Sequence, residues 1–86
     1  MKTKKLVRKI KELLSADQRD QIAKADSLDK ILEKLDKKEA ALREKLAGER
    51  HEARRKEIRQ KLEVLAAQRE KGEKLSKKIE PLRETA

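Results

Sequence analysis

Large aliphatic residues recur at helical spacing along most of this chain, and polar residues fill the positions between them. The first stripe consists of Leu6, Val7, Ile10, Leu13 and Leu14. These residues occupy positions i, i+1, i+4, i+7 and i+8, which lie on one face of an amphipathic helix. Ser15 and Gln18 then match a capping box, in which the hydroxyl accepts from a first-turn amide and Gln18 reaches back. Either a second helix begins there, or one helix over about residues 4–24 is kinked near residue 15.

The second stripe predicts a helix over about residues 28–47, with a heptad-like seam. Asp26 and Ser27 offer an N-cap directly before it. The apolar members of the seam are Leu28, Ile31, Leu32, Leu35, Leu42 and Leu46. Glu39 interrupts the seam, so the apolar pattern alone leaves this position unexplained.

The third stripe runs from Ile58 to Leu82 and predicts a helix over about residues 52–80. Pro81 disfavours helical geometry at the residue before it, so we expect the helix to end there. Residues 81–86 are then expected to form a frayed tail.

Between the second and third stripes, residues 47–57 contain no Leu, Ile or Val. Either one long helix crosses this break in a dimeric coiled coil, or the chain turns near residues 48–51 into an antiparallel helical hairpin. Folding about that turn pairs Leu46 with Ala53, Leu42 with Ile58, Leu35 with Leu65 and Leu28 with Gly72. Gly48 is the C-cap candidate for the turn. We therefore favour one all-α domain over residues 1–86: a hairpin with the N-terminal amphipathic helix covering one side.

Composition supports the all-α prediction and indicates a marginal isolated chain. The 86 residues include 12 Leu, 5 Ile and 2 Val, no aromatic residue, and two Gly with one Pro. Burying so few aliphatic side chains offsets only part of the conformational entropy lost on folding. A partner protein or a second copy of the chain is therefore expected to add stability.

Few residues are suited to catalysis or metal binding. His51 is the single histidine and the chain has no Cys, whereas a zinc site needs about four such ligands. No Gly-x-Ser-x-Gly elbow or glycine-rich phosphate loop is present. We therefore expect no enzymatic activity, no catalytic or metal-binding residues and no cofactor.

The favoured function is protein–protein interaction, as an adaptor or assembly module that acts through apolar helix faces. Leu75 and Ile79 are the candidate partner seam. The partner would be another protein or a second copy of the chain.

The alternative function is binding of nucleic acid or the ribosome, since the net charge is +9. The candidate phosphate contacts are Arg50, Arg54, Arg55 and Arg59. Glutamates interleave the basic residues, so most of the charge is expected to be paired along helix faces. Peripheral membrane contact through residues 1–14 is the least favoured alternative.

No apolar run reaches the roughly 18 residues of a membrane-spanning helix, and no apolar region follows the basic N-terminus. Together with the absence of Cys, this predicts a cytoplasmic protein. Three segments, 37–46, 54–58 and 64–72, resemble those of short, basic, uncharacterised bacterial helical proteins. That resemblance implies a bacterial, cytoplasmic protein and no particular activity.

Overall fold

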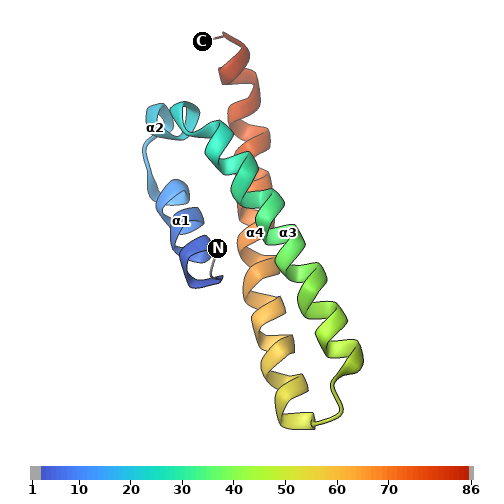
Figure 1. Cartoon of the computed structure of the whole chain (residues 1–86). Coiled ribbons are helices and arrows are strands. Elements are labelled where there is room, and N and C mark those ends of the chain that lie inside the picture. The colour runs from blue at the N-terminus through green and yellow to red at the C-terminus, as the bar shows by residue number, and fades with distance from the viewer. Residues whose placement is uncertain (1–2, 86) are drawn as a thin grey trace.

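The computed structural model describes residues 3–85, with side chains described as far as Arg83, and this part of the chain forms four helices (Figure 1). The helices are α1 (Thr3–Ser15), α2 (Gln18–Ala23), α3 (Ala25–Gly48) and α4 (Glu52–Thr85). α3 and α4 form a long antiparallel hairpin, and α1 and α2 lie beside the half of it that is remote from the turn (Figure 1). The rod measures 51 × 19 × 18 Å. The predicted all-α hairpin is confirmed, and the single long helix is wrong.

The predicted break near residue 15 is present, but its cap is a different residue. Asp17 is the N-cap of α2, and its Oδ1 accepts from the Asp20 amide at 2.9 Å. The Ser15 hydroxyl instead donates to carbonyls in the last turn of α1, so the capping box at Ser15 is wrong. Gln21 stabilises the junction between α1 and α2, because its buried Nε2 donates to the Leu13 carbonyl at 3.0 Å.

α3 begins three residues earlier than predicted, at Ala25. Lys24 alone separates it from α2, and no side chain caps the helix there. The predicted N-cap at Asp26 and Ser27 is therefore wrong, since both residues lie inside the helix. The Asp26 carboxylate instead accepts from Arg83 of α4.

The predicted turn is present, and a side chain from α4 closes it. Gly48 is the last residue of α3 and does not have a positive φ, so it is not a left-handed C-cap. Nη1 of Arg55 donates to the carbonyls of Leu46 at 2.8 Å and Glu49 at 3.0 Å. A guanidinium thus caps the carbonyl end of α3 and ties the start of α4 to it.

The hydrophobic core lies where α1 covers the hairpin. Its buried members come from α1, α3 and α4, and they are Leu6, Ile10, Leu13, Ala25, Leu28, Ile31, Leu35, Leu65, Leu75 and Ile79. Leu75 is 7% exposed and Ile79 is 1% exposed. We therefore assign these two residues to the core of the chain itself and not to a partner seam, because the apolar faces of the same molecule already cover them.

The α3 side chain that meets Gly72 differs from the predicted one. A Cβ added to Gly72 would lie 2.7 Å from Leu32 Cδ2 and 2.8 Å from Ile10 Cδ1. The α3 residue closest to Gly72 is therefore Leu32 and not Leu28. The prediction matched apolar positions alone, whereas the register also has to place Glu39 against Arg69. Gly72 allows α1, α3 and α4 to approach closely at one point.

α4 continues through Pro81 to Thr85, so the helix end at residue 80 and the frayed tail over 81–85 are wrong. Residue 86 lies outside the described residues. Proline removes one helical hydrogen bond, but the surrounding turns are held to the hairpin. Ile79 is buried, and Arg83 lies 2.6 Å from an Asp26 oxygen and 3.2 Å from an Asp29 oxygen.

Candidate polyanion-binding face

The carboxylates of α3 are directed largely toward arginines of α4. Glu39 is fully buried, and its Oε2 accepts from Arg69 Nε at 2.6 Å. Asp36 lies 3.8 Å from the same nitrogen. Near the other end of α3, Asp26 and Asp29 both pair with Arg83. Four acidic residues of α3 thus pair with two arginines of α4, which offset part of their negative charge.

Arg69 is the centre of this arrangement. Its hydrogen bond with Glu39 and a second one with Glu73, at 2.9 Å, raise the pKa of the Arg69 guanidinium above its ordinary value. The guanidinium is therefore permanently charged, and its donors are directed to carboxylates of the same chain. It is not available to an external anion.

The lysines of α3 occupy another side of the helix. Lys30, Lys34, Lys37 and Lys38 stand at i, i+4, i+7 and i+8, which places them on one face. Together with Lys9 of α1 and Lys24 at the α2–α3 junction, they line two adjoining grooves between α1 and α3. We call these six lysines the lysine face.

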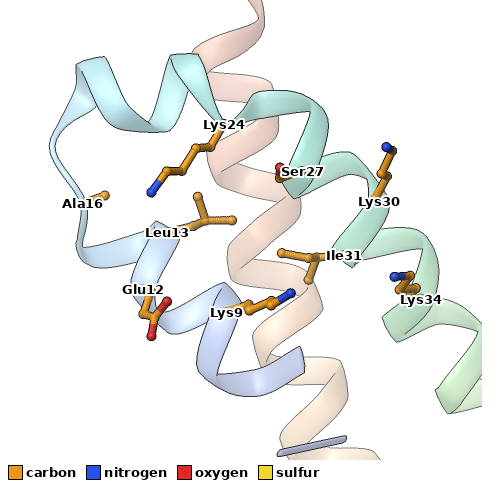
Figure 2. A pocket seen from close by; sticks show the side chains of 9 residues that line it. All are labelled: Lys9, Glu12, Leu13, Ala16, Lys24, Ser27, Lys30, Ile31 and Lys34. Atoms are coloured by element: carbon orange, nitrogen blue, oxygen red, sulfur yellow. The ribbon is translucent and has the colours of Figure 1, made fainter. Parts of the chain in front are cut away.

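The first groove has a volume of about 330 Å³ and lies between α1 and the start of α3 (Figure 2). Leu13 and Ile31 point toward each other across it, and Lys9 reaches from α1 toward α3 (Figure 2). Lys24, Lys30, Lys34, Ser27, Glu12 and Ala16 complete the lining. Glu12 is turned away from α3 (Figure 2), so the single lining carboxylate lies apart from Lys30 and Lys34 of that helix.

The second groove continues the first along α3 and shares Lys34 with it. Its volume is about 290 Å³, and its lining is Leu6, Lys34, Lys37, Lys38 and Ala41. No carboxylate lines this groove. The two grooves together present six ammonium groups and one carboxylate.

The lysine face is largely unpaired among the described residues. Lys37 lies 3.6 Å from Glu33, and both side chains are mostly exposed, which makes this a weak pair. The other five lysines form no ion pair with a described carboxylate: Lys9, Lys24, Lys30, Lys34 and Lys38. The prediction that most charge is paired along helix faces is wrong for the lysines of the described chain, since Lys37 is the one lysine among them in an ion pair.

The four predicted phosphate contacts lie at and after the hairpin turn, and two of them are already engaged. Arg55 caps α3, as described above, and Arg59 Nη2 lies 2.8 Å from Glu52 Oε1. Arg50 and Arg54 are exposed, and their side chains form no ion pair or hydrogen bond with described residues. The structure therefore leaves two cations free at the turn, apart from the lysine face.

Carboxylates also order the turn. The His51 amide donates to Glu49 Oε1 at 3.1 Å, and this hydrogen bond, together with nearby Arg54, lowers the pKa of Glu49 below its ordinary value of 4.5. The hydrogen bond from Arg59 lowers the pKa of Glu52 in the same way. Both carboxylates therefore reduce the positive field of the turn at neutral pH.

The remaining candidate sites have little chemical support. His51 is exposed at the turn, and no group of three His, Cys, Asp or Glu side chains within the described region could hold a metal ion. In α1 the apolar face that membrane contact would use is packed on the hairpin, since Leu6, Ile10 and Leu13 are buried. None of the helices described is both long enough and apolar enough to cross a bilayer.

Comparison with known proteins finds no matching family model, no matching curated protein and no matching solved structure. The resemblance to short, basic bacterial helical proteins stays a prediction. The lysine face is therefore the feature of the described chain that bears most directly on function. The spacing of its α3 members is visible in the sequence, but their lack of partners depends on which way the carboxylates are directed.

Proposed function

We propose that this protein is a non-enzymatic nucleic-acid-binding protein that contacts phosphates through the lysine face. The observation that supports this function is the excess of charge along the two grooves, where six lysines face one carboxylate. Five of the six have no carboxylate partner among the described residues, so binding a phosphate would break no ion pair at those positions. Lysine ammonium groups bind phosphates as point charges and release the counterions condensed on the polyanion.

Protein binding through an apolar helix face receives less support from the same structure. Among the side chains that the structure describes, Val64 is the one large hydrophobic side chain that is exposed, at 50%. The other apolar stripes pack on one another within the chain. A protein partner or a second copy of the chain would therefore find mainly charged surface.

The test compares two triple variants with the same change in net charge. Lys30→Gln/Lys34→Gln/Lys38→Gln removes three unpaired cations of the lysine face. Its control, Lys56→Gln/Lys74→Gln/Lys77→Gln, removes three exposed lysines of α4 that line neither groove. Binding to labelled duplex DNA and structured RNA is measured by fluorescence anisotropy over a range of salt concentrations.

We expect the wild-type chain to bind with a dissociation constant of about 10⁻⁴ to 10⁻⁶ M at physiological salt, as sequence-independent binders do. The lysine-face variant should lose most of this affinity, and the slope of log K against log salt should fall by about 2 to 3. The α4 variant should keep a slope close to that of the wild type. Equal losses in the two variants, or no binding by the wild type at low salt, would contradict the proposal.

A third variant tests the turn. Arg50→Gln/Arg54→Gln removes the two free cations there and leaves the Arg55 cap in place. Because these residues lie at the far end of the rod from α2, we expect a smaller loss than for the lysine-face variant (Figure 1). A larger loss of affinity in this variant would indicate that the phosphate contacts lie at the turn and not in the grooves. It would contradict the assignment of the lysine face as the binding site.

A further inference from the structure

Most of the lysine face is carried by one packed helix. Five of its members lie on or directly before α3, from Lys24 to Lys38, a stretch of about 21 Å at 1.5 Å per residue. Leu28, Ile31 and Leu35 are buried along the same helix and hold it against its neighbours. A duplex is already straight over this length, since its persistence length is about 50 nm, whereas a flexible single strand would lose conformational entropy on being aligned along the helix.

The grooves offer no surface on which unpaired bases could stack. The chain contains no aromatic residue, and base–aromatic stacking supplies about 1–3 kcal/mol per base in proteins that bind single strands. The apolar residues that line the grooves are largely covered, because Leu6 is 0% exposed and Leu13 and Ile31 are each 6% exposed. A single strand would therefore gain only phosphate contacts here, at about half the charge density of a duplex.

The cations of the face also lack the geometry that reads base sequence. All six are lysines, whereas bidentate recognition of guanine uses mainly the planar fork of arginine. Two arginines close to α3, Arg69 and Arg83, are directed to carboxylates of the hairpin. The face can therefore position a phosphate backbone but has few groups with which to distinguish base pairs.

From these three features we infer that the lysine face binds double-stranded nucleic acid along its backbone, in preference to single strands and without regard to base sequence. This inference rests on the proposed function and adds the class of nucleic acid to it. It requires neither entry of a helix into a groove of the duplex nor separation of its strands. Duplex DNA and duplex RNA are both expected ligands of the lysine face, because both present continuous phosphate backbones.

The test uses the full chain with one labelled strand, presented alone or annealed to its complement. The strand lacks self-complementarity and is about twice as long as the stretch that α3 can span, so that either form covers the whole face. Three unrelated sequences are compared as DNA and as RNA at one salt concentration. We expect each duplex to bind at least about fivefold more tightly than its single strand, with the three duplexes within about threefold of one another.

The lysine-face variant connects this preference to the grooves. In Lys30→Gln/Lys34→Gln/Lys38→Gln the affinities for duplex and single strand should become similar, whereas the α4 variant should retain the difference. Equal or tighter binding of single strands by the wild type would overturn the duplex inference and leave phosphate binding intact. A spread of more than about tenfold among the duplexes would overturn the backbone-only mode. Failure to bind either form would instead remove the proposed function itself.

Discussion

Oε2 of Glu39 lies 2.6 Å from Nε of Arg69, and the Glu39 side chain has no exposed surface. Oε1 of Glu39 also lies 3.5 Å from Arg69 Nη2, so both oxygens face the guanidinium. Glu39 stands where the apolar seam of α3 is interrupted, and Arg69 meets it across the hairpin. A buried carboxylate is costly without a partner, so any other register that left Glu39 unpaired would be unfavourable.

Removing one member of this pair should destabilise the protein strongly. In Arg69→Leu the Glu39 carboxylate would remain buried, with exposed Arg43, 3.8 Å away, as its remaining cationic neighbour. We expect the free energy of unfolding to fall by about 3–5 kcal/mol, measured by urea denaturation followed by circular dichroism. Glu39→Leu/Arg69→Leu should recover most of the loss, because it removes the buried charge together with its partner.

The control for this pair is Arg43→Leu, which removes an exposed partner of the same carboxylate. We expect a change of less than about 1 kcal/mol in that variant. If Arg69→Leu were no more damaging than Arg43→Leu, the assignment of the Glu39–Arg69 pair as the element that sets the register would be wrong.

A larger side chain at Gly72 should separate α1 from the hairpin. An added Cβ would already meet methyl groups of Leu32 and Ile10 at less than 3 Å, so Gly72→Leu has to displace both side chains. We expect the free energy of unfolding to fall by about 1–3 kcal/mol despite the better helix propensity of leucine. Hydrogen exchange should show faster opening of α1 than in the wild type.

Gly48 provides the matched control for this variant. No atom lies within 4 Å of a Cβ built there, and its φ is not positive. Gly48→Ala should therefore raise stability by up to about 1 kcal/mol. A gain of stability in Gly72→Leu as well would show that the helices do not close on Gly72.

Replacing Pro81 should stabilise α4. The helix runs from Glu52 to Thr85, so an amide at position 81 could donate to the carbonyl of Lys77, four residues earlier. We expect Pro81→Ala to raise the free energy of unfolding by about 1–3 kcal/mol and to increase the helical circular dichroism signal slightly. No change in either quantity would indicate that α4 ends before Pro81.

The turn should make stability depend on pH in the acidic range. Hydrogen bonds from the His51 amide and from Arg59 lower the pKa values of Glu49 and Glu52, respectively, below 4.5. The folded state therefore binds fewer protons than the unfolded state near this pH, and stability is lost as the pH falls through the folded pKa values. We expect the melting temperature to fall below about pH 4.5, and Glu49→Gln/Glu52→Gln to show a smaller fall.

Glu63 supplies the control for the pH series. Its side chain is exposed and forms no hydrogen bond or ion pair with the rest of the described chain. Glu63→Gln should therefore retain the acid sensitivity of the wild type. If it reduced that sensitivity as much as the double variant, the hydrogen bonds at the turn would not be its source.

The helical spacing of the apolar residues, and the breaks in that spacing, account for the parts of the fold that were predicted correctly. Three apolar stripes predicted helices on both sides of the turn, and the lack of aliphatic residues around Gly48 predicted the turn itself. The caps were less predictable. Ser15, Asp26 and Gly48 all have suitable chemistry for caps, but Asp17 caps α2, Arg55 caps the end of α3, and no side chain caps the start of α3. Several nearby residues could satisfy the same backbone groups, and the surrounding packing selects among them.

Periodicity and composition along the chain specified the helical class and the excess of positive charge, and they favoured the hairpin turn over one long helix. Tertiary structure decided the register and the location of that charge. Arg69 lies 30 positions from Glu39, and Arg83 lies 57 positions from Asp26, so neither pair follows from local spacing. Once these arginines engage the acidic side of α3, its lysines stand largely unpaired beside α1. The physical reason is that pairing of charges depends on distance in space, which helical spacing alone does not specify.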